Sequence, residues 1–177
     1  EGLFTYMYPM IDESGRPAQG ASIIGIAEKR HGKKVLEILN SPSVKRNFRN
    51  DIKFLIGENP YADKNAAAAS VGIYAIKTYN KDEAKLEGEH VTDAKFDFDQ
   101  KGTPMISLSM DEEGAAKWAK LTRDNIGNPI AIALDDYVYT APNVNQEITG
   151  GNSQITGSFT PGEGTALANI LKTGKLP

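Results

Sequence analysis

The sequence predicts an α+β fold in which antiparallel β-hairpins pack against helices. Apolar and polar residues alternate on both sides of a turn at residues 100–104, which is typical of a hairpin with one face in solvent. A second alternating pair of segments flanks Asp135 and Asp136. Between the two predicted hairpins lies an apolar stripe of helical spacing with start and stop signals at its ends. Strands and helices therefore mix along the chain.

Length and composition indicate an ordinary globular protein. The 177 residues suffice for one domain, or one domain with a sub-lobe. The hydrophobic fraction is 40%, and a net charge of −3 does not call for a nucleic-acid partner. The absence of cysteine excludes disulfides, thiol catalysis and thiolate metal sites, and the sequence has no apolar run of membrane-spanning length. Because the chain opens on Glu1 rather than Met, we interpret it as a segment of a longer protein.

The first eighty residues predict short elements joined by loops. Aromatic residues at 3–8 predict a strand, and glycine and proline punctuate the turn that follows. Apolar residues at helical spacing then predict two short helices, and alternation predicts two strands. The helices are expected around residues 23–27 and 35–39, and the strands at residues 52–56 and 71–79.

The C-terminal part carries clearer signals. Asp111 is a good N-cap for a helix that Gly127 ends, and Thr160 and Glu163 form a capping box at the start of the last helix. In the first hairpin, residues 94–99 pair with 105–110. The other expected features are strands at residues 130–134, 138–140 and 154–157, a turn at Gly150 and Gly151, a helix end at Gly174, and inward-facing Phe96, Phe98, Ala115, Trp118, Ala119, Thr122, Ala166, Leu167, Ile170 and Leu171.

No catalytic, metal or cofactor motif occurs. Asp135 and Asp136 suggest a metal or general-base site, but adjacent strand residues point to opposite faces, so a turn is the better interpretation. His31 and His90 lie in charged contexts without metal-ligand spacing. Neither a phosphate-binding glycine motif nor a GxSxG motif is present. We therefore expect no catalytic residue, no bound metal and no cofactor.

Residues 28–53 are basic, with eight Lys and Arg against three Asp and Glu. A nucleic acid or another anionic surface is one interpretation of such a run. The cations are spread over predicted helix faces without interleaved aromatic residues, however. A solvated surface is the favoured interpretation, and no nucleic-acid partner is expected.

Two segments carry a specific pattern: EGAAKWAKLTRDNIGNPIAIALDDYVYTAP from Glu113, and ITGGNSQITGSFTPGEGTALANILKTGKLP from Ile148. Through many positions matched in order, this half resembles the SecD/SecDF family, membrane subunits that assist export through the bacterial Sec translocon. Asp136 and Gly164 depart from the family, which commonly has a small turn residue and an alanine there. The motif positions expected to hold the fold are Gly114, Thr122, Asn125, Gly127, Leu134, Asp135, Pro142, Gly150, Gly151, Gly157, Gly174 and Pro177.

The resemblance implies the first periplasmic domain of such a subunit, lying between its first two membrane helices and having no enzymatic activity. That domain has a ferredoxin-like base and a mobile head lobe. We expect residues 71–177 to form the family core, and residues 1–70 a lineage-variable α/β lobe that belongs to the head. Such enlargement is similar to that in fused SecDF proteins of the Bacteroidetes type.

By the same resemblance, the chain is expected to lie in the periplasm and to bind the unfolded preprotein as it emerges, assisting export driven by the proton-motive force. Partners implied through the full-length protein are the SecYEG translocon, SecF and YajC. From loop composition, the candidate contacts with the client are Asn59, Tyr61, Ala67 and Ala68. The alternatives are a scaffold that binds no client and, much less favoured, a hydrolase built on Asp135 and Asp136.

Overall fold

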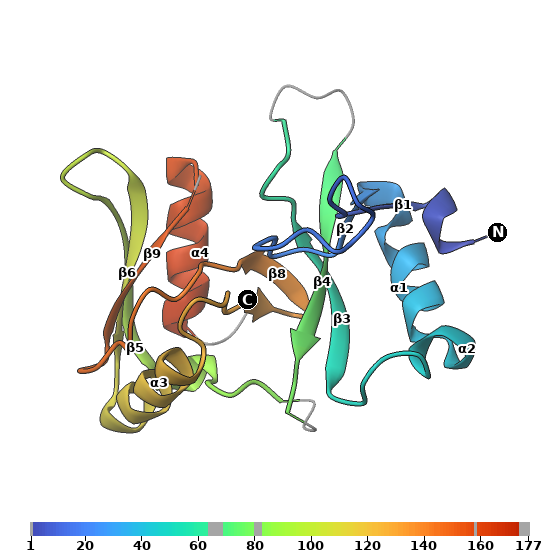
Figure 1. Ribbon diagram of the computed structural model, residues 1–177. Coiled ribbons are helices and arrows are strands. Elements are labelled where there is room, and N and C mark those ends of the chain that lie inside the picture. The colour runs from blue at the N-terminus through green and yellow to red at the C-terminus, as the bar shows by residue number, and fades with distance from the viewer. Residues whose placement is uncertain (1, 64–68, 80–82, 158, 174–177) are drawn as a thin grey trace. The chain divides into compact units, whose positions relative to one another are not determined.

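The computed structural model describes residues 2–63, 69–79, 83–157 and 159–173 (Figure 1). Within them the chain forms helices and two β-sheets, so the predicted α+β class is confirmed. It divides into two compact units. Unit 1 comprises residues 1–83 and 131–141, and unit 2 comprises residues 84–130 and 142–177. The expected division at residue 70 into a variable lobe and a family core, with a ferredoxin-like base, stays a prediction.

Unit 1 is built on a six-stranded sheet in the order β1-β2-β4-β3-β8-β7. All neighbours in it are antiparallel except β3 and β8, which run parallel. The strands are β1 (Met7–Pro9), β2 (Gly25–Glu28), β3 (Ile52–Glu58), β4 (Ser70–Lys77), β7 (Ile132–Leu134) and β8 (Tyr137–Thr140).

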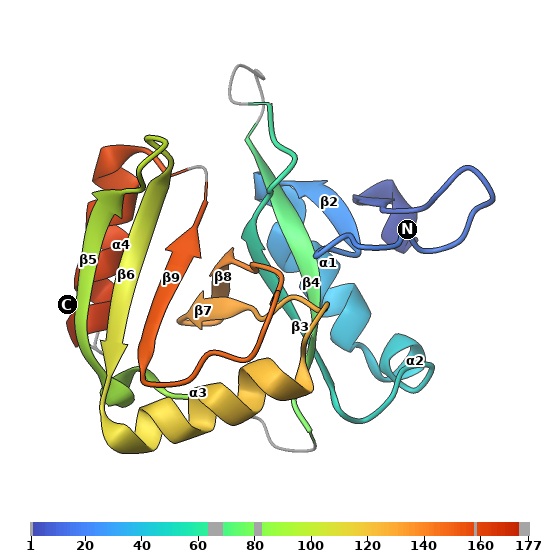
Figure 2. The same cartoon turned by 60° about the vertical axis from the view of Figure 1, so that its left-hand side comes forward.

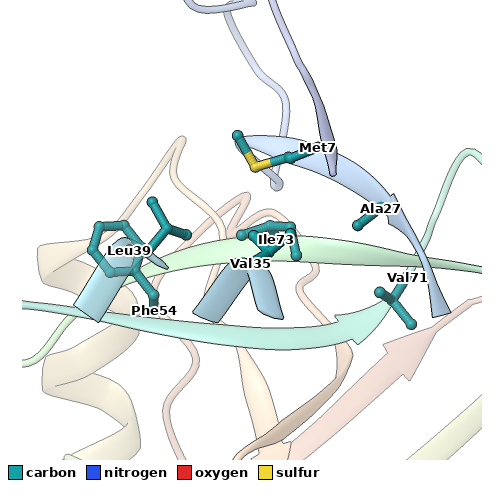
Figure 3. Packing of buried hydrophobic residues seen from close by; sticks show 7 residues of the cluster. All are labelled: Met7, Ala27, Val35, Leu39, Phe54, Val71 and Ile73. Carbon is teal, nitrogen blue, oxygen red and sulfur yellow. The ribbon is translucent and has the colours of Figure 1, made fainter. Parts of the chain in front are cut away.

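Helix α1 (Gly32–Asn40) packs on one face of this sheet and is followed by the single turn α2 (Pro42–Lys45). Val35 and Leu39 on α1 meet Phe54 of β3 and Ile73 of β4 in the core cluster of Figure 3. Burying each such side chain contributes roughly 1.5–3 kcal/mol to folding. On the opposite face, a second cluster consists of Ile23, Leu55, Tyr74 and Val138.

Unit 2 contains the three-stranded antiparallel sheet β5-β6-β9. Helix α4 packs mainly on β5, and α3 contacts β6 (Figure 2). Its elements are β5 (Val91–Phe98), β6 (Pro104–Met110), α3 (Glu112–Asp124), β9 (Asn152–Thr156) and α4 (Pro161–Thr173), with the 3-10 turn η3 (Gly88–His90) before β5. The hairpin β5–β6 and both helix starts are confirmed: Asp111 accepts from Gly114 N, and Thr160 and Glu163 bond reciprocally.

Some predicted elements are wrong. The expected helix around residues 23–27 is not a helix, since residues 25–27 belong to strand β2 and residues 23–24 lie outside any helix or strand. The first half of the expected strand at residues 3–8 is a 3-10 turn, η1 (Leu3–Thr5). Phe98 is 48% exposed instead of facing inward. In α4, Ala168 is buried where Ala166 was expected, because the buried stripe runs through Gly164, Leu167, Ala168 and Leu171.

Candidate functional site

Asp135 and Asp136 form the turn between β7 and β8. Their φ angles of 48° and 59° are both left-handed, which gives the primed turn that suits the twist of a hairpin, and aspartate tolerates this conformation. Asp136 Oδ1 lies 3.1 Å from Lys53 Nζ. The predicted turn is thus confirmed. Across the residues that the structure describes, no group of three or more His, Asp and Glu is placed to hold a metal ion.

Glu58, the last residue of β3, accepts hydrogen bonds from two tyrosine hydroxyls. Tyr137 donates to Glu58 Oε1 at 2.9 Å, and Tyr74 donates to the Glu58 carbonyl at 2.6 Å. Burial, with the Glu58 charge, raises the pKa of Tyr74 to about 12, and burial together with the Glu58 hydrogen bond raises the pKa of Tyr137. Both phenols therefore remain protonated donors at neutral pH, and they join β4 and β8 to the end of β3.

Two of the four candidate client contacts lie just beyond Glu58. Asn59 Nδ2 donates to Ser70 Oγ at 2.9 Å, and Asn59 Oδ1 accepts from the Tyr61 backbone N–H at 3.0 Å. This side-chain turn fixes the start of the loop and leaves Tyr61 54% exposed. Ala67 and Ala68 fall outside the described residues. The contact role of all four stays a prediction.

Several motif residues of unit 2 stabilise α3 and the irregular segment between β8 and β9. The buried Thr122 Oγ1 donates to the Trp118 carbonyl at 2.8 Å and accepts from Ile148 N at 2.9 Å. Asn125 Nδ2 donates to the Leu121 carbonyl at 2.8 Å, near the end of the helix. These side chains satisfy backbone groups that helix ends and irregular segments otherwise leave unpaired.

Other motif residues lie at close approaches or turns. Gly127, Gly150 and Gly151 have φ angles of 81°, 82° and 73°, a left-handed conformation that glycine adopts without strain. The Pro142 carbonyl accepts from Ile130 N at 3.0 Å. At Gly157 an added Cβ would lie 2.7 Å from the Phe159 ring. Leu134 is half-buried in β7. The last two motif residues, Gly174 and Pro177, fall outside the described residues.

A charged cluster around His90 was not predicted from the sequence. His90 is 7% exposed, and its Nδ1 lies 3.1 Å from Asp111 Oδ2 while its Nε2 lies 2.9 Å from Lys117 Nζ. Lys117 also pairs with Glu113 Oε1 at 2.7 Å. These contacts fit a neutral imidazole that donates from Nδ1 and accepts at Nε2.

Hydrogen bonds and charges shift the pKa values of Asp111, Glu113 and Lys117. The hydrogen bond from the Gly114 N–H, followed by that from His90, lowers the pKa of Asp111. The hydrogen bond between Lys117 and Glu113 raises the pKa of Lys117 and lowers the pKa of Glu113. Gly114 is packed tightly here, because an added Cβ would lie 2.7 Å from His90 Cβ. No local spacing could have revealed the cluster, since Asp111 and Lys117 follow His90 by 21 and 27 residues.

Comparison with known proteins identifies the family. The family model described as "SecDF, P1 head subdomain" matches residues 67–177. The protein translocase subunit SecD of Rhodothermus marinus is 33% identical over 92% of this chain and 25% of its own length, and that of Acidaminococcus fermentans is 39% identical over 78% and 33%. The chain thus spans a third or less of these curated relatives.

A solved structure described as "a membrane component SecDF that enhances protein export" has 43% sequence identity and a TM-score of 0.49, and the match covers 58% of this chain and 46% of that one. Among the described residues, no helix is long and apolar enough to cross a membrane. The match to the head subdomain covers well over half of the chain. The chain therefore belongs to the SecDF P1 head family, a non-enzymatic part of the SecD protein translocase subunits.

Proposed function

We propose that this chain is the periplasmic head of a SecD or SecDF subunit and that it binds the unfolded preprotein emerging from the Sec translocon. The observation that carries the proposal is the family match over residues 67–177. The relation to a translocase subunit over 92% of the chain supports it. Movement of the head, coupled to proton flow in the membrane part, would then favour export over backsliding.

The exposed side chains of unit 1 suit contact with unfolded chains. Phe4, Tyr8 and Ile11 are 71%, 73% and 53% exposed, and Tyr61 is 54% exposed. An unfolded polypeptide offers apolar side chains and unpaired backbone groups, and it is bound through apolar surface and free strand edges. We retain Asn59, Tyr61, Ala67 and Ala68 as the proposed contact segment, supported by the exposure of Tyr61.

The wider assembly is part of the same proposal. The full-length protein would lie in the inner membrane, contact SecYEG, SecF and YajC, and present this head in the periplasm. The name SecDF of a Thermus thermophilus relative, 46% identical over 52% of this chain, supports a fused subunit as one arrangement. We further propose a fused subunit of the Bacteroidetes type, for which the complete coding sequence is the direct test.

Photocrosslinking during export tests client binding. A photoreactive residue at position 61 of the full-length protein should form a crosslink to a secreted protein arrested in transit. The matched control is position 101, an exposed lysine in the β5–β6 turn, which should give less product.

The alternative is a scaffold that positions the membrane part without touching the client. Absence of crosslinks from position 61 and from every other exposed position of the head would favour this scaffold. Crosslinks from other positions alone would keep the function and move the contact away from Tyr61.

A further inference from the structure

Strand β3 has a free edge over its first half. On one side β3 pairs with β4 along its whole length, from Ile52 opposite Lys77 to Glu58 opposite Val71. On the other side β8 pairs only with Ile56 and Gly57. Within the described residues no strand pairs with residues 52–55 on that side. Because alternate strand residues direct their N–H and C=O to opposite sides, about half of these residues present backbone groups to the free edge.

An open groove of about 510 Å³ lies at this edge, entirely within unit 1. Residues 52–55 themselves line it, which means that the groove follows the strand. The other lining residues come from α1, α2, the β7–β8 turn, and the loops before β3 and after β4, which lie at the same end of this antiparallel pair: Leu36, Asn40, Lys45, Asn50, Thr78 and Asp136.

The two sides of the groove differ in chemistry. On the α1 side, Leu36 and Ile52 pack half-buried against the cluster that contains Phe54, so an apolar side chain would find apolar contacts there. Lys45, exposed on α2, forms no ion pair with another described residue that the structure records. On the opposite side, Lys53 is paired with Asp136. The groove therefore combines an apolar wall with an uncompensated cation.

We propose that an extended segment of an unfolded polypeptide binds here by adding a strand to the free edge of β3. About four residues would lie in line with β8 and end against the Asp135–Asp136 turn. An apolar side chain of the segment would contact Leu36, and a carboxylate two residues away, on the same face of the added strand, would reach Lys45. Strand addition draws affinity from backbone hydrogen bonds and selectivity from alternate side chains. This inference rests on the proposed function and assigns its client contact to a site separate from Tyr61.

Charge argues against a second copy of the chain as the occupant. Two copies paired symmetrically through this edge would bring Lys45 of one copy to the same interface as Lys45 of the other. Like charges across a sheet edge destabilise the pairing. A segment that carries a carboxylate gains an attraction at the same place.

Peptide binding to the whole 177-residue chain tests the proposal. The probe is a labelled twelve-residue peptide of alternating threonine and valine with one central glutamate, measured by fluorescence anisotropy. Methylating the backbone nitrogens of four successive central residues blocks both edges of the peptide and should weaken binding about tenfold. Lys45→Glu should weaken it about fivefold. The matched control Lys33→Glu, on the solvent side of α1 and outside the groove, should change it less than twofold.

A second probe is a reduced and carboxymethylated protein that cannot fold. It distinguishes failure of the groove as the binding site from failure of client binding altogether. If the unfolded protein binds the chain, but methylation and Lys45→Glu have no effect and the peptide does not compete, the groove is not the site and the proposed function stands. If neither the unfolded protein nor the peptide binds, client binding fails as a whole. A dimer that Lys45→Glu dissociates would overturn the proposal in favour of a second copy.

Discussion

The buried hydroxyl of Thr122 accepts a 2.9 Å hydrogen bond from the backbone N–H of Ile148, 26 residues further along the chain. Thr122 lies on α3, and Ile148 lies in the irregular segment between β8 and β9. The same hydroxyl donates to the Trp118 carbonyl. One side chain thus attaches a segment without regular secondary structure to a helix of the same unit.

We expect Thr122→Val to lower the free energy of unfolding by about 1–3 kcal/mol, because the isosteric side chain leaves the Ile148 N–H without its partner. Urea unfolding followed by circular dichroism measures this. Thr122→Ser keeps the hydroxyl and loses only a methyl group, so it should recover much of the difference. Equal losses in the two variants would show that packing rather than the hydrogen bond is responsible.

Gly114 should not tolerate alanine, although it lies in the first turn of α3, where alanine is the better helix former. An added Cβ would lie 2.7 Å from His90 Cβ, closer than two side chains can approach. We expect Gly114→Ala to lower the unfolding midpoint by displacing His90 from Asp111 and Lys117. Gly162→Ala is the matched control, since nothing lies within 4 Å of its Cβ position in the first turn of α4. It should be neutral or stabilising, by up to about 1 kcal/mol.

The left-handed turn at Asp135 gives a third prediction. With φ at 48°, Asp135→Gly relieves strain, and we expect it to raise stability by about 0.5–1 kcal/mol. Asp135→Val places a β-branched residue in the same conformation and should lower stability by about 1–2 kcal/mol. Thermal unfolding of the two variants beside the parent chain measures both. The opposite order would contradict the assigned turn.

Asp135 and Asp136 also allow a direct test of the hydrolase alternative. Calorimetric titration with Mg²⁺ and Mn²⁺ should show no binding above background in the parent chain or in Asp135→Ala. Binding lost in Asp135→Ala would revive a metal site at the turn.

Local signals predicted unit 2 better than unit 1. The caps at Asp111 and Thr160 depend on residues three positions apart, so the sequence contains them directly. Strand β2 was mistaken for a helix although its burial alternates as in a strand, with Gly25 and Ala27 buried and Ile26 and Glu28 half-buried. The misleading signal is the pair of buried residues Ile23, which lies before the strand, and Ala27, because four positions is also a helical spacing.

The candidate site was less accessible to sequence reasoning than the fold. Tyr61 was selected from loop composition; it is 54% exposed, and its role as a client contact stays a prediction. The groove beside β3 depends on how far β8 pairs along β3, since the contact stops at Ile56. Such a pairing joins residues some eighty positions apart, and no window of local sequence specifies its length.

The last prediction concerns the alkaline titration of the two tyrosines that donate hydrogen bonds to Glu58. The chain has seven tyrosines, and we expect two, Tyr74 and Tyr137, to ionise well above the usual pKa of about 10. For Tyr74, a folded-state pKa of about 12 exceeds that of the unfolded chain. Its contribution to stability is therefore fully present below pH about 10 and is lost as pH rises towards about 12. Phenolate absorbance at increasing pH measures the ionisation.

Variants at these positions assign the late titration. Tyr74→Phe should remove one late-ionising group and, by losing the bond to the Glu58 carbonyl, lower stability by about 0.5–1.5 kcal/mol. Glu58→Gln removes a negative charge and the carboxylate acceptor, so it should lower the pKa of Tyr137, while Tyr74 stays high because burial is the main cause of its shift. Seven tyrosines that ionise together near pH 10 would contradict the arrangement around Glu58, and with it the attachment of β8 to the end of β3 that leaves the first half of this strand free.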